Sequence, residues 1–293
     1  MKGIILAGGT GSRLFPITKS VSKQLLPIYN KPLIYYPLSI LMIAGIKEIL
    51  IITSPHDQSN FFELLGDGSN YGITLSYAVQ KEPKGLAEAF VIGEEFIGND
   101  SVCLILGDNF IYGSDLQKNL FRIIESVERN DCAYVLGYEV ENPSDFGIAE
   151  IDKEGLILSI EEKPKEPKSN TAIIGLYFYP NDVIDKAKKV KPSDRGELEI
   201  TSINNLYVKS KKIKLKKLSR GYVWLDTGNP EDLMQAGLFV RSIEQKTGLG
   251  IAVLEEISLN MGYISIEEIK ERIKNEKSHY YTFLNKFIKE YSK

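Results

Sequence analysis

Short apolar runs alternate with amphipathic stretches along the first half of the chain. Residues 3–7, 48–53 and 102–106 read GIILA, EILIIT and VCLIL, and apolar runs of this length predict strands buried on both faces of a sheet. Residues 37–44 and 115–127 have the length and the apolar spacing typical of helices. This order of strand and helix predicts an α/β fold with parallel strands.

The pattern changes between residues 133 and 179. Apolar segments become shorter there and are separated by turn signals such as ENPSDFG and KPKEPKSN. We therefore expect a β-rich insertion, over roughly residues 110–220, that makes the central sheet mixed. The insertion belongs to a main domain predicted over residues 1–245, and residues 246–293 are predicted to form a C-terminal helical segment.

Helix signals dominate the end of the chain. Asn229 and Pro230 predict the start of a helix and Gly248 its end, while Ser265 and Glu268 predict a capping box on a later helix. A last helix carries an apolar stripe, which favours packing against the rest of the chain over a subunit interface. The stripe consists of Tyr280, Leu284, Phe287, Ile288 and Tyr291.

Composition argues for a globular protein with small ligands. The chain has 293 residues, 43% of them hydrophobic, and its 36 basic and 39 acidic side chains give a net charge of −3. This balance excludes a strongly basic surface for nucleic acid or an anionic membrane. The lysine-rich run KSKKIKLKKLSRG is interrupted by Ile213, Leu215 and Leu218, which favours an exposed edge strand over a binding patch.

The cysteine content and the termini indicate a cytoplasmic protein. Cys103 and Cys132 are too few for a disulfide framework, so we expect buried, reduced thiols. The apolar stretch at the N-terminus breaks into glycines too early for a signal peptide. The longest apolar stretch, residues 31–47, contains Pro37 and is too short to cross a membrane.

A glycine-rich turn follows the first predicted strand. Gly8, Gly9 and Gly11 lack Cβ atoms, so their backbone amides can approach an anion closely. Arg13 adds a planar fork that suits phosphate, and Lys23 offers a second cation. The turn therefore predicts a polyphosphate cradle, and the alternative from the glycines alone is a tight turn beside a surface arginine.

Two familiar phosphate motifs do not fit this turn. A Walker loop ends in GK[ST], whereas Arg13 and Leu14 follow the last glycine and serine here. A dinucleotide fingerprint would place its third glycine at Leu14. The glycines alone therefore leave the ligand open.

Two acidic residues follow apolar strands. Asp108 comes after VCLIL, and Asp226 lies in YVWLDTG. Ligands of open α/β sheets gather at the carboxyl ends of strands, and two carboxylates could hold one Mg²⁺ through oxygen. Turn aspartates are the alternative interpretation. His56 and His279 lie in unlike contexts, and the serines show no nucleophile elbow, so a histidine-based triad has little support.

The glycine turn is part of a longer resemblance. LAGGTGSRLFPIT and KQLLPIYNKP resemble the sugar nucleotidyltransferases, with Ser12 in place of threonine and Ile28 in place of valine. The resemblance continues in the family order over nearly the whole chain, through FFELLGDGSNYG, GLAEAF, LILGDN, IEEKP, GLYFYP, RGELEIT, YVWLDTG and LEEI. It implies a Rossmann-like three-layer α/β/α nucleotidyltransferase fold with a mixed central sheet, a β-rich sugar-binding insertion and C-terminal helices.

Within this family the chain is most similar to the branch that acts on dTTP and glucose 1-phosphate. The resemblance implies a Mg²⁺-dependent nucleotidyltransferase in which the sugar phosphate attacks the α-phosphorus in line, giving dTDP-glucose and diphosphate. It also implies a homotetramer that supplies dTDP-rhamnose and related sugars. A general base is unnecessary for this reaction, because the second pKa of a phosphate monoester is about 6.

The resemblance also implies roles for individual residues. Asp108 and Asp226 match the metal ligands. Arg13, Lys23 and Lys163 match the catalytic cations, although a lysine beside Pro164 in a charged loop is more often solvated. The nucleotide-binding positions are Leu6, Gly8, Gly9, Gly11, Gln80 and Gly85, and the sugar-phosphate-binding positions are Gly147, Glu162, Ile173 and Tyr177.

Two features depart from the family pattern. DFG stands where relatives often have tyrosine or arginine before the glycine, which leaves the sugar selectivity open. Arg220, Glu256 and Ile257 match a regulatory site, but its glycine and histidine elements are not evident in IYGSDL.

Two alternatives to thymidylyl transfer remain at this point. The Gln80 amide can pair with the N3 hydrogen and O4 of thymine or of uracil, so a uridylyltransferase that makes UDP-glucose is the near alternative. One methyl group discriminates between these bases by only about 1–3 kcal/mol. A non-catalytic nucleotide sensor of the same fold is the other alternative, and it would have lost one of the acids or cations that this chain keeps.

Overall fold

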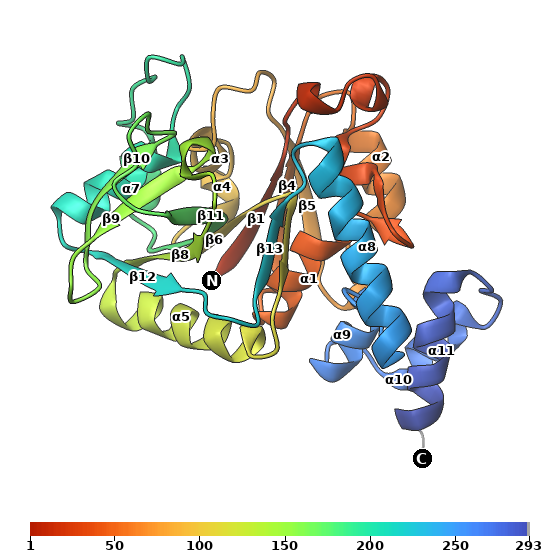
Figure 1. Ribbon diagram of the computed structural model, residues 1–293. Coiled ribbons are helices and arrows are strands. Elements are labelled where there is room, and N and C mark those ends of the chain that lie inside the picture. The colour runs from red at the N-terminus through yellow and green to blue at the C-terminus, as the bar shows by residue number, and fades with distance from the viewer. Residues whose placement is uncertain (292–293) are drawn as a thin grey trace.

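Nine strands form one mixed sheet at the centre of the computed structural model (Figure 1). The structure describes residues 1–291, except for the side chains of residues 290 and 291. The strand order is β10-β9-β11-β6-β1-β4-β5, with β8 beside β11 and β12 beside β8. Four neighbouring strands are parallel: β1 (Lys2–Ala7), β4 (Glu48–Thr53), β5 (Thr74–Val79) and β6 (Val102–Leu106). The apolar runs predicted β1, β4 and β6, whereas β5 was not predicted.

The β-rich region makes the sheet mixed, as predicted. Strand β11 runs antiparallel to β6 and continues the sheet on that side. Its neighbours come from the same region of the chain, and β12 pairs only with β8 among the described strands, which confirms an edge position for the lysine-rich run. These strands are β8 (Ala133–Glu139), β9 (Gly147–Ile151), β10 (Ile157–Glu162), β11 (Thr171–Tyr179) and β12 (Ile213–Lys217).

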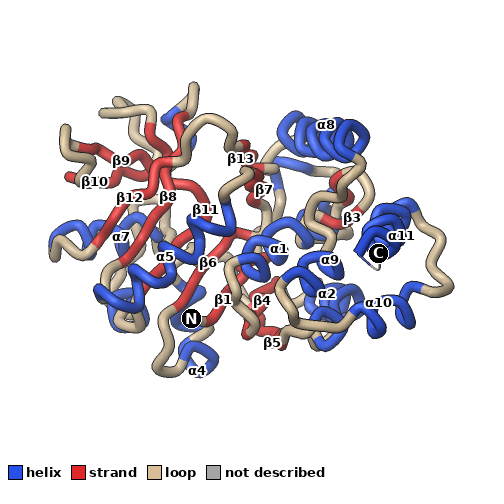
Figure 2. The backbone as a smooth tube through the Cα atoms, turned by 90° about the horizontal axis from the view of Figure 1, so that it is seen from below, coloured by secondary structure: helices blue, strands red, loops and turns tan. Residues whose placement is uncertain are grey.

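Helices cover both faces of the sheet, which gives the three-layer architecture (Figure 2). Successive side chains of β1 point to opposite faces, so Ile5 belongs to one apolar cluster and Ile4 to the other. The face of Ile5 carries α1 (Tyr35–Ile43), α2 (Gln58–Leu65) and α5 (Leu116–Asn130). The face of Ile4 carries α3 (Glu88–Ile92), α4 (Glu94–Ile97), α6 (Val183–Ala187) and α7 (Ile200–Lys209).

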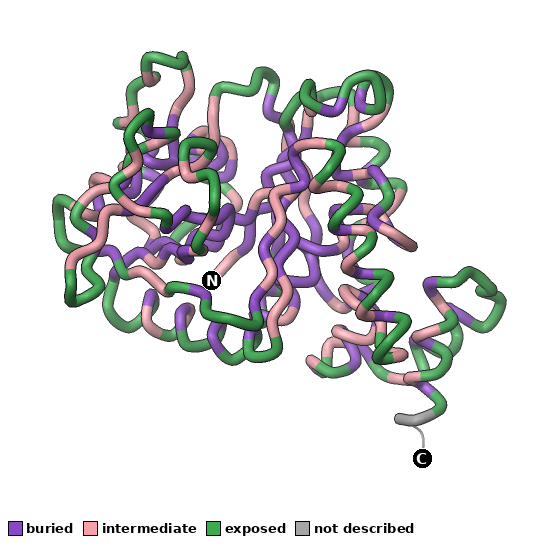
Figure 3. The backbone as a smooth tube through the Cα atoms, viewed as in Figure 1, coloured by how far each residue is buried: buried purple, intermediate pink, exposed green. Residues whose placement is uncertain are grey.

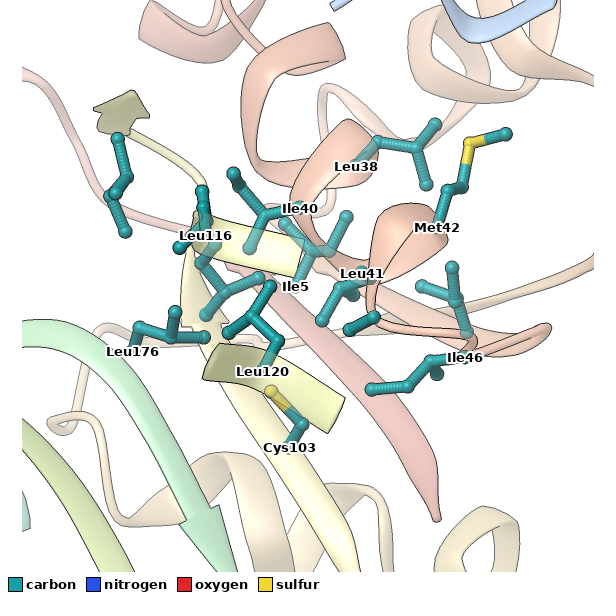
Figure 4. Close-up of a cluster of buried hydrophobic side chains, with 14 of the residues drawn as sticks. Ile5, Leu38, Ile40, Leu41, Met42, Ile46, Cys103, Leu116, Leu120 and Leu176 are labelled. Carbon is teal, nitrogen blue, oxygen red and sulfur yellow. The ribbon is translucent and has the colours of Figure 1, made fainter. Parts of the chain in front are cut away.

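The core on the Ile5 face is dense and apolar. Figure 4 shows Ile5 between Leu41 of α1 and Leu120 of α5, with Cys103 of β6 nearby. All four side chains are fully buried. Cys103 and Cys132 are both free thiols, as predicted, and burial raises the pKa of Cys103 well above its ordinary value. In Figure 3 the buried residues follow the central strands, while the outer loops are exposed.

Two small sheets and several short turns complete the main body. Strand β7 (Asn109–Tyr112) pairs antiparallel with β13 (Val223–Asp226), and β2 (Pro27–Ile28) pairs with β3 (Lys31–Pro32). Single 3₁₀ turns occur at Ser12–Leu14, Ile17–Lys19, Lys23–Leu25, Ser69–Tyr71 and Pro143–Asp145.

The C-terminal helices begin and end as predicted. Helix α8 (Pro230–Thr247) is capped by the Asn229 side chain, which accepts from the Asp232 N–H at 2.9 Å, and ends at Gly248 with φ +68°. It is followed by α9 (Leu254–Asn260), α10 (Ile266–Ile273) and α11 (His279–Tyr291). Ser265 and Glu268 form the expected capping box on α10.

Helices α9 to α11 share an apolar cluster of their own at one end of the molecule (Figure 1). The predicted stripe of α11 lies in it, with Tyr280, Leu284 and Ile288 buried, whereas the side chain of Tyr291 lies outside the described part. Helix α9 also contacts α1, so this segment packs against the main body. The division at residue 245 stays a prediction. None of the helices within residues 1–291 is both long and apolar enough to cross a membrane.

Candidate active site

Three segments predicted to bind ligands meet at one edge of the parallel sheet. Gly8 follows β1, Gln80 follows β5, and Asp108 lies two residues beyond the end of β6. Because these strands are parallel and neighbouring, their carboxyl ends lie at the same edge. The segments that the sequence predicts to bind ligands therefore lie close together, and their binding roles stay predictions.

Two adjoining cavities open at this edge. The large cavity has a volume of about 390 Å³ and lies between the glycine turn and the β-rich region. The small cavity, of about 210 Å³, lies against the ends of β1 and β5. Both are lined by Leu86, Leu106, Asp108 and Glu197. A shared carboxylate between two cavities suits a site that brings two ligands together.

The sequence-predicted residues divide between the two cavities. The small cavity is lined by Leu6, Gly9, Gly11, Lys23, Gln80 and Gly85, and the large one by Arg13, Gly147, Glu162, Lys163, Ile173, Tyr177 and Asp226. Asp108 lines both. Gly8 lines neither, but a Cβ atom there would lie 2.8 Å from the Gln80 Oε1. The structure thus brings these residues together, and their individual roles stay predictions.

The two acidic residues are neighbours through strand pairing. Asp226 ends β13 and stands opposite Asn109 of β7, directly after Asp108. Burial and the Asp108 carboxylate raise the pKa of Asp226 to about 6. Burial also acts to raise the pKa of Asp108, but the Lys23 ammonium that bonds to it and the Asn109 amide outweigh burial and hold this pKa below its ordinary value.

This pair fits a divalent cation that prefers oxygen. Two partly buried carboxylates of like charge repel each other, and a cation between them would relieve the repulsion. The described residues contain no group of three or more His, Cys, Asp or Glu side chains that could hold a metal. A cation here would therefore take its other ligands from a substrate or from water, as Mg²⁺ commonly does.

The glycine turn is shaped by close contacts. Gly11 has φ +60°, and its carbonyl accepts from the Thr18 hydroxyl at 2.7 Å, so a larger residue would be both strained and crowded. Gly9 faces open space. The Arg13 side chain is 65% exposed and its Nη2 lies 3.9 Å from the Asp226 Oδ2, which leaves most of the guanidinium available to a ligand.

Lys163 has an unusual backbone at the mouth of the large cavity. Its φ is +46°, and its N–H donates to the Phe146 carbonyl at 2.9 Å. The side chain is exposed, as the alternative interpretation of a solvated lysine expects, but it lines the cavity wall. A non-glycine residue in this region is strained, which is a feature found at ligand-binding positions.

Sequence reasoning missed four residues that shape the large cavity. Asn109 Oδ1 accepts from Trp224 Nε1 at 2.7 Å, while its Nδ2 donates to Asp108 Oδ1 at 3.0 Å. Thr201 donates to Glu162 Oε2 at 2.6 Å, and Arg195 Nη1 lies 3.7 Å from Glu162 Oε1. All four residues stand inside the motifs LILGDN, YVWLDTG and RGELEIT. The motifs could therefore have identified them as site residues, but their hydrogen bonds could not be predicted from the sequence.

The residues predicted for regulation lie apart from this site. Glu256 and Ile257 line a cavity beside α1 and α5, whereas Arg220 lines another beside Tyr138 and Lys217. Burial raises the pKa of Glu256 to about 7. The three residues line two separate cavities, and a regulatory role for them stays a prediction.

Comparison with known proteins gives matches over nearly the whole chain. Residues 2–243 match the model of the nucleotidyl transferase family. The chain is 51% identical over 290 residues to a protein of Neisseria meningitidis named glucose-1-phosphate thymidylyltransferase, a match that covers 99% of this chain and 100% of the relative. A protein of the same name from Mycobacterium tuberculosis is 51% identical over 272 residues, which is 93% of each chain.

Solved structures give the same fold. A Bacillus anthracis structure described as a glucose-1-phosphate thymidylyltransferase in complex with sucrose has a TM-score of 0.76 and 42% identity, covering 82% of this chain and 95% of the other. A UDP-glucose pyrophosphorylase complexed with UDP-glucose has a TM-score of 0.72 and 30% identity, covering 84% and 98%. The three-layer fold with its mixed sheet is therefore the nucleotidyltransferase fold, as expected.

Proposed function

The chain belongs to the nucleotidyl transferase family and is an enzyme, and from this premise we propose that it transfers a thymidylyl group from dTTP to α-D-glucose 1-phosphate. The products are dTDP-α-D-glucose and diphosphate. The observation that carries the proposal is the pair of adjoining cavities that share Asp108, because it offers separate space for a nucleotide and for a sugar phosphate at one carboxylate.

The reaction is a direct displacement at phosphorus. A phosphate oxygen of the sugar phosphate attacks the α-phosphorus of dTTP, the new P–O bond forms, and the bond to diphosphate breaks. This oxygen is already largely ionised at neutral pH, so no side chain has to remove a proton. Neither cavity is lined by a histidine among the described residues, which agrees with this view. Catalysis then consists of positioning two anions and neutralising their charge.

The cationic side chains would share this task. Arg13 is largely exposed beside Asp226 and can reach the departing diphosphate. Lys23 is buried beside Asp108 and can neutralise the triphosphate, while Lys163 can orient the sugar phosphate at the other end of the large cavity. The backbone of Gly8, Gly9 and Gly11 can bind phosphate oxygens next to Lys23.

We propose that Asp108 and Asp226 hold a Mg²⁺ ion. An ion held there would supply positive charge that neutralises the phosphate groups of the substrates. The support is the pair of partly buried carboxylates: Asp226 stands opposite Asn109, which directly follows Asp108, and the pKa of Asp226 is raised. The sugar would lie against Gly147, Glu162, Ile173 and Tyr177, where the Glu162 carboxylate can accept hydrogen bonds from sugar hydroxyls.

Three further properties are part of the proposal. We infer a homotetramer in the cytoplasm whose product feeds dTDP-rhamnose and related cell-surface sugars. We also propose that residues 1–245 are the catalytic domain and that residues 246–293 support it. The family relationship is what supports these properties.

A uridylyltransferase that makes UDP-glucose is the second candidate. The similarity to a UDP-glucose pyrophosphorylase supports it, but the identity there is 30%, against 51% for the thymidylyltransferase of Neisseria meningitidis. A non-catalytic nucleotide sensor is less well supported, because all five proposed acids and cations are present in the two cavities.

The test is diphosphate release from glucose 1-phosphate with dTTP, UTP, CTP, ATP and GTP separately. We expect the highest kcat/KM with dTTP. Preference for UTP would overturn the thymidylyl assignment, and no release with any nucleotide would overturn the enzymatic function. Asp226→Ala should remove activity without changing the circular dichroism spectrum, whereas Asp185→Ala, at an exposed position of α6 outside both cavities, should have wild-type activity.

A further inference from the structure

The amide of Gln80 has a defined orientation at the end of β5. Its Nε2 donates to the Glu88 Oε2 at 2.8 Å and to the Gly85 carbonyl at 3.3 Å. A carboxylate and a carbonyl are both acceptors, so only the NH₂ side of the amide can face them. The reverse orientation would put the amide oxygen against a carboxylate, which is repulsive. Glu88 therefore holds the Nε2 end of the amide toward itself and turns the Oε1 end away.

The amide oxygen consequently faces the opposite side. Gln80 is 5% exposed and lines the small cavity, and its Oε1 lies where a Cβ atom on Gly8 would be only 2.8 Å away. Its backbone is fixed as well, because the Gln80 N–H donates to the Thr53 carbonyl at the end of β4 at 2.9 Å. The Oε1 acceptor of Gln80 thus lies on the side of Gly8, and the donor end of the amide is occupied by Glu88 and Gly85.

We propose that Glu88 is a positioning residue that sets base selectivity by holding Gln80 as an acceptor for the N3–H of a pyrimidine. This inference rests on the proposed function, which puts the base in the small cavity. Thymine and uracil carry a hydrogen on N3, whereas N3 of cytosine is an acceptor and would meet the amide oxygen with two lone pairs opposed. Glu88 does not line the cavity and acts only through Gln80.

Glu88 also has a structural explanation that the test must separate. It stands in the first turn of α3, where a negative charge is favoured by the helix dipole. A purely structural role predicts that replacing Glu88 changes stability, or weakens all nucleotides alike. A positioning role predicts a change in the ratio between nucleotides, because only the hydrogen-bonding edge of the base is affected.

The test compares dTTP, dUTP and dCTP on the wild type and on Glu88→Gln. The glutamine keeps the shape of the side chain, but its amide can both donate and accept, so Gln80 can adopt either orientation. We expect the affinity for dCTP relative to dTTP, measured by titration calorimetry, to rise roughly fivefold, which corresponds to one net hydrogen bond. The dUTP to dTTP ratio should stay constant, since uracil and thymine share the same edge.

Two further variants complete the design. Glu82→Gln makes the same chemical change at an exposed position of the neighbouring loop, where Glu82 forms an ion pair with Lys84, and its affinity ratios should equal those of the wild type. If Glu88→Gln does not fold, Glu88→Ala replaces it in the test. Alanine removes the acceptor without adding a donor, so the affinity for dCTP relative to dTTP should also rise. The inference would be overturned if the ratio of dCTP affinity to dTTP affinity were unchanged in the folded Glu88 variants. It would also be overturned if Glu82→Gln changed this ratio as much as Glu88→Gln does.

The same measurements separate this inference from the proposed function. If the wild type binds dTTP, releases no diphosphate, and shows the ratio change in Glu88→Gln, the inference stands and the transferase function is overturned. If the wild type releases diphosphate but Glu88→Gln has an unchanged ratio of dCTP to dTTP affinity, the transferase function stands and the inference about Glu88 is overturned. A wild type that binds none of the three nucleotides overturns both.

Discussion

Trp224 Nε1 donates to Asn109 Oδ1 at 2.7 Å, and this bond fixes the side chain of Asn109, the first residue of β7. The Gly175 N–H donates to the same oxygen at 3.1 Å, so both acceptor positions of the amide are used. The Asn109 nitrogen is thereby turned toward Asp108 Oδ1. Through this chain of bonds the indole orients one of the two carboxylates at the centre of the site.

Trp224→Phe tests this orientation. Phenylalanine keeps the aromatic contact with Phe146 but removes the N–H donor. Since one net hydrogen bond contributes about 1 kcal/mol, we expect kcat for dTDP-glucose formation to fall roughly fivefold. The unfolding midpoint should change little. Initial-rate kinetics and thermal unfolding check these two expectations.

A comparison at another aromatic position sharpens the result. Tyr134→Phe also removes a polar group from an aromatic ring, at a position of β8 outside both cavities. It should have wild-type kcat. Equal kcat values for Trp224→Phe and the wild type would show that the Trp224 to Asn109 bond does not orient Asp108.

Thr201 orients Glu162, a proposed sugar-binding residue of the large cavity, as Trp224 orients Asn109. Its hydroxyl donates to Glu162 Oε2 at 2.6 Å, and Arg195 lies near the other carboxylate oxygen. Thr201→Val keeps the shape and removes the donor, so Glu162 should lose its fixed orientation. We expect the KM for glucose 1-phosphate to rise about threefold to tenfold while the KM for dTTP stays constant.

Thr201→Ser serves as the conservative variant, because it retains the hydroxyl. It should restore the wild-type KM for glucose 1-phosphate. Parallel increases in both KM values for Thr201→Val would indicate a general disturbance of α7, and the specific role in positioning Glu162 would be rejected.

The sequence predicted the location of the site better than its internal bonds. Asp108 and Asp226 were both predicted at the ends of apolar strands, and both line the large cavity, although Asp226 ends a strand of the separate β7-β13 sheet. Their pairing through β7 and β13 could not be predicted, because it depends on strand register. The contact between Gln80 and Glu88 also had no signal beyond the GLAEAF motif.

Buried charges were the least predictable feature. Lys31 and Glu244 are 213 residues apart, and neither the KQLLPIYNKP motif that contains Lys31 nor the residues around Glu244 indicated this pairing. Apolar residues recur at helical spacing along α8, at Leu233, Ala236, Val240 and Ile243, but only Ala236 and Val240 of these are buried, together with Glu244. Burial of Glu244 is possible because three groups bond to it, and such a network depends on tertiary structure.

The pair of Lys31 and Glu244 yields a prediction for stability. Lys31 Nζ lies 3.1 Å from Glu244 Oε1, and both side chains are almost fully buried. Burial lowers the pKa of Lys31, although Glu244 opposes this. Lys31→Met should reduce the free energy of unfolding by about 3–5 kcal/mol, because it leaves a buried carboxylate without its cation. Urea denaturation measures this change.

The exposed pair of Lys212 and Asp131 provides the matched control. Lys212→Met removes an ion pair of 2.7 Å between two half-exposed side chains, and should cost less than about 1 kcal/mol. The double variant Lys31→Met, Glu244→Gln should recover part of the lost stability. Equal losses in Lys31→Met and Lys212→Met would mean that burial does not strengthen the first pair.

Glu256 gives the last prediction, which concerns pH. Burial raises the pKa of its carboxyl to about 7, and no hydrogen bond or ion pair joins it to another of the described residues. The folded state therefore binds a proton more tightly than the unfolded state, whose pKa lies near 4.3. Between these two pKa values the folded protein holds more protons, so stability contributed by this group falls as pH rises.

Glu256→Gln should remove this dependence, because glutamine is uncharged at every pH. The free energy of unfolding of Glu256→Gln should exceed that of the wild type by about 1–2 kcal/mol at pH 8, a value reduced for partial solvent contact. The difference should shrink as pH falls through 7 and be small near pH 4.5. Urea denaturation of both proteins between pH 4.5 and pH 8 measures it, and Glu267→Gln on the exposed side of α10 controls for the loss of one charge. A difference that is constant with pH would contradict ionisation of Glu256 as the cause.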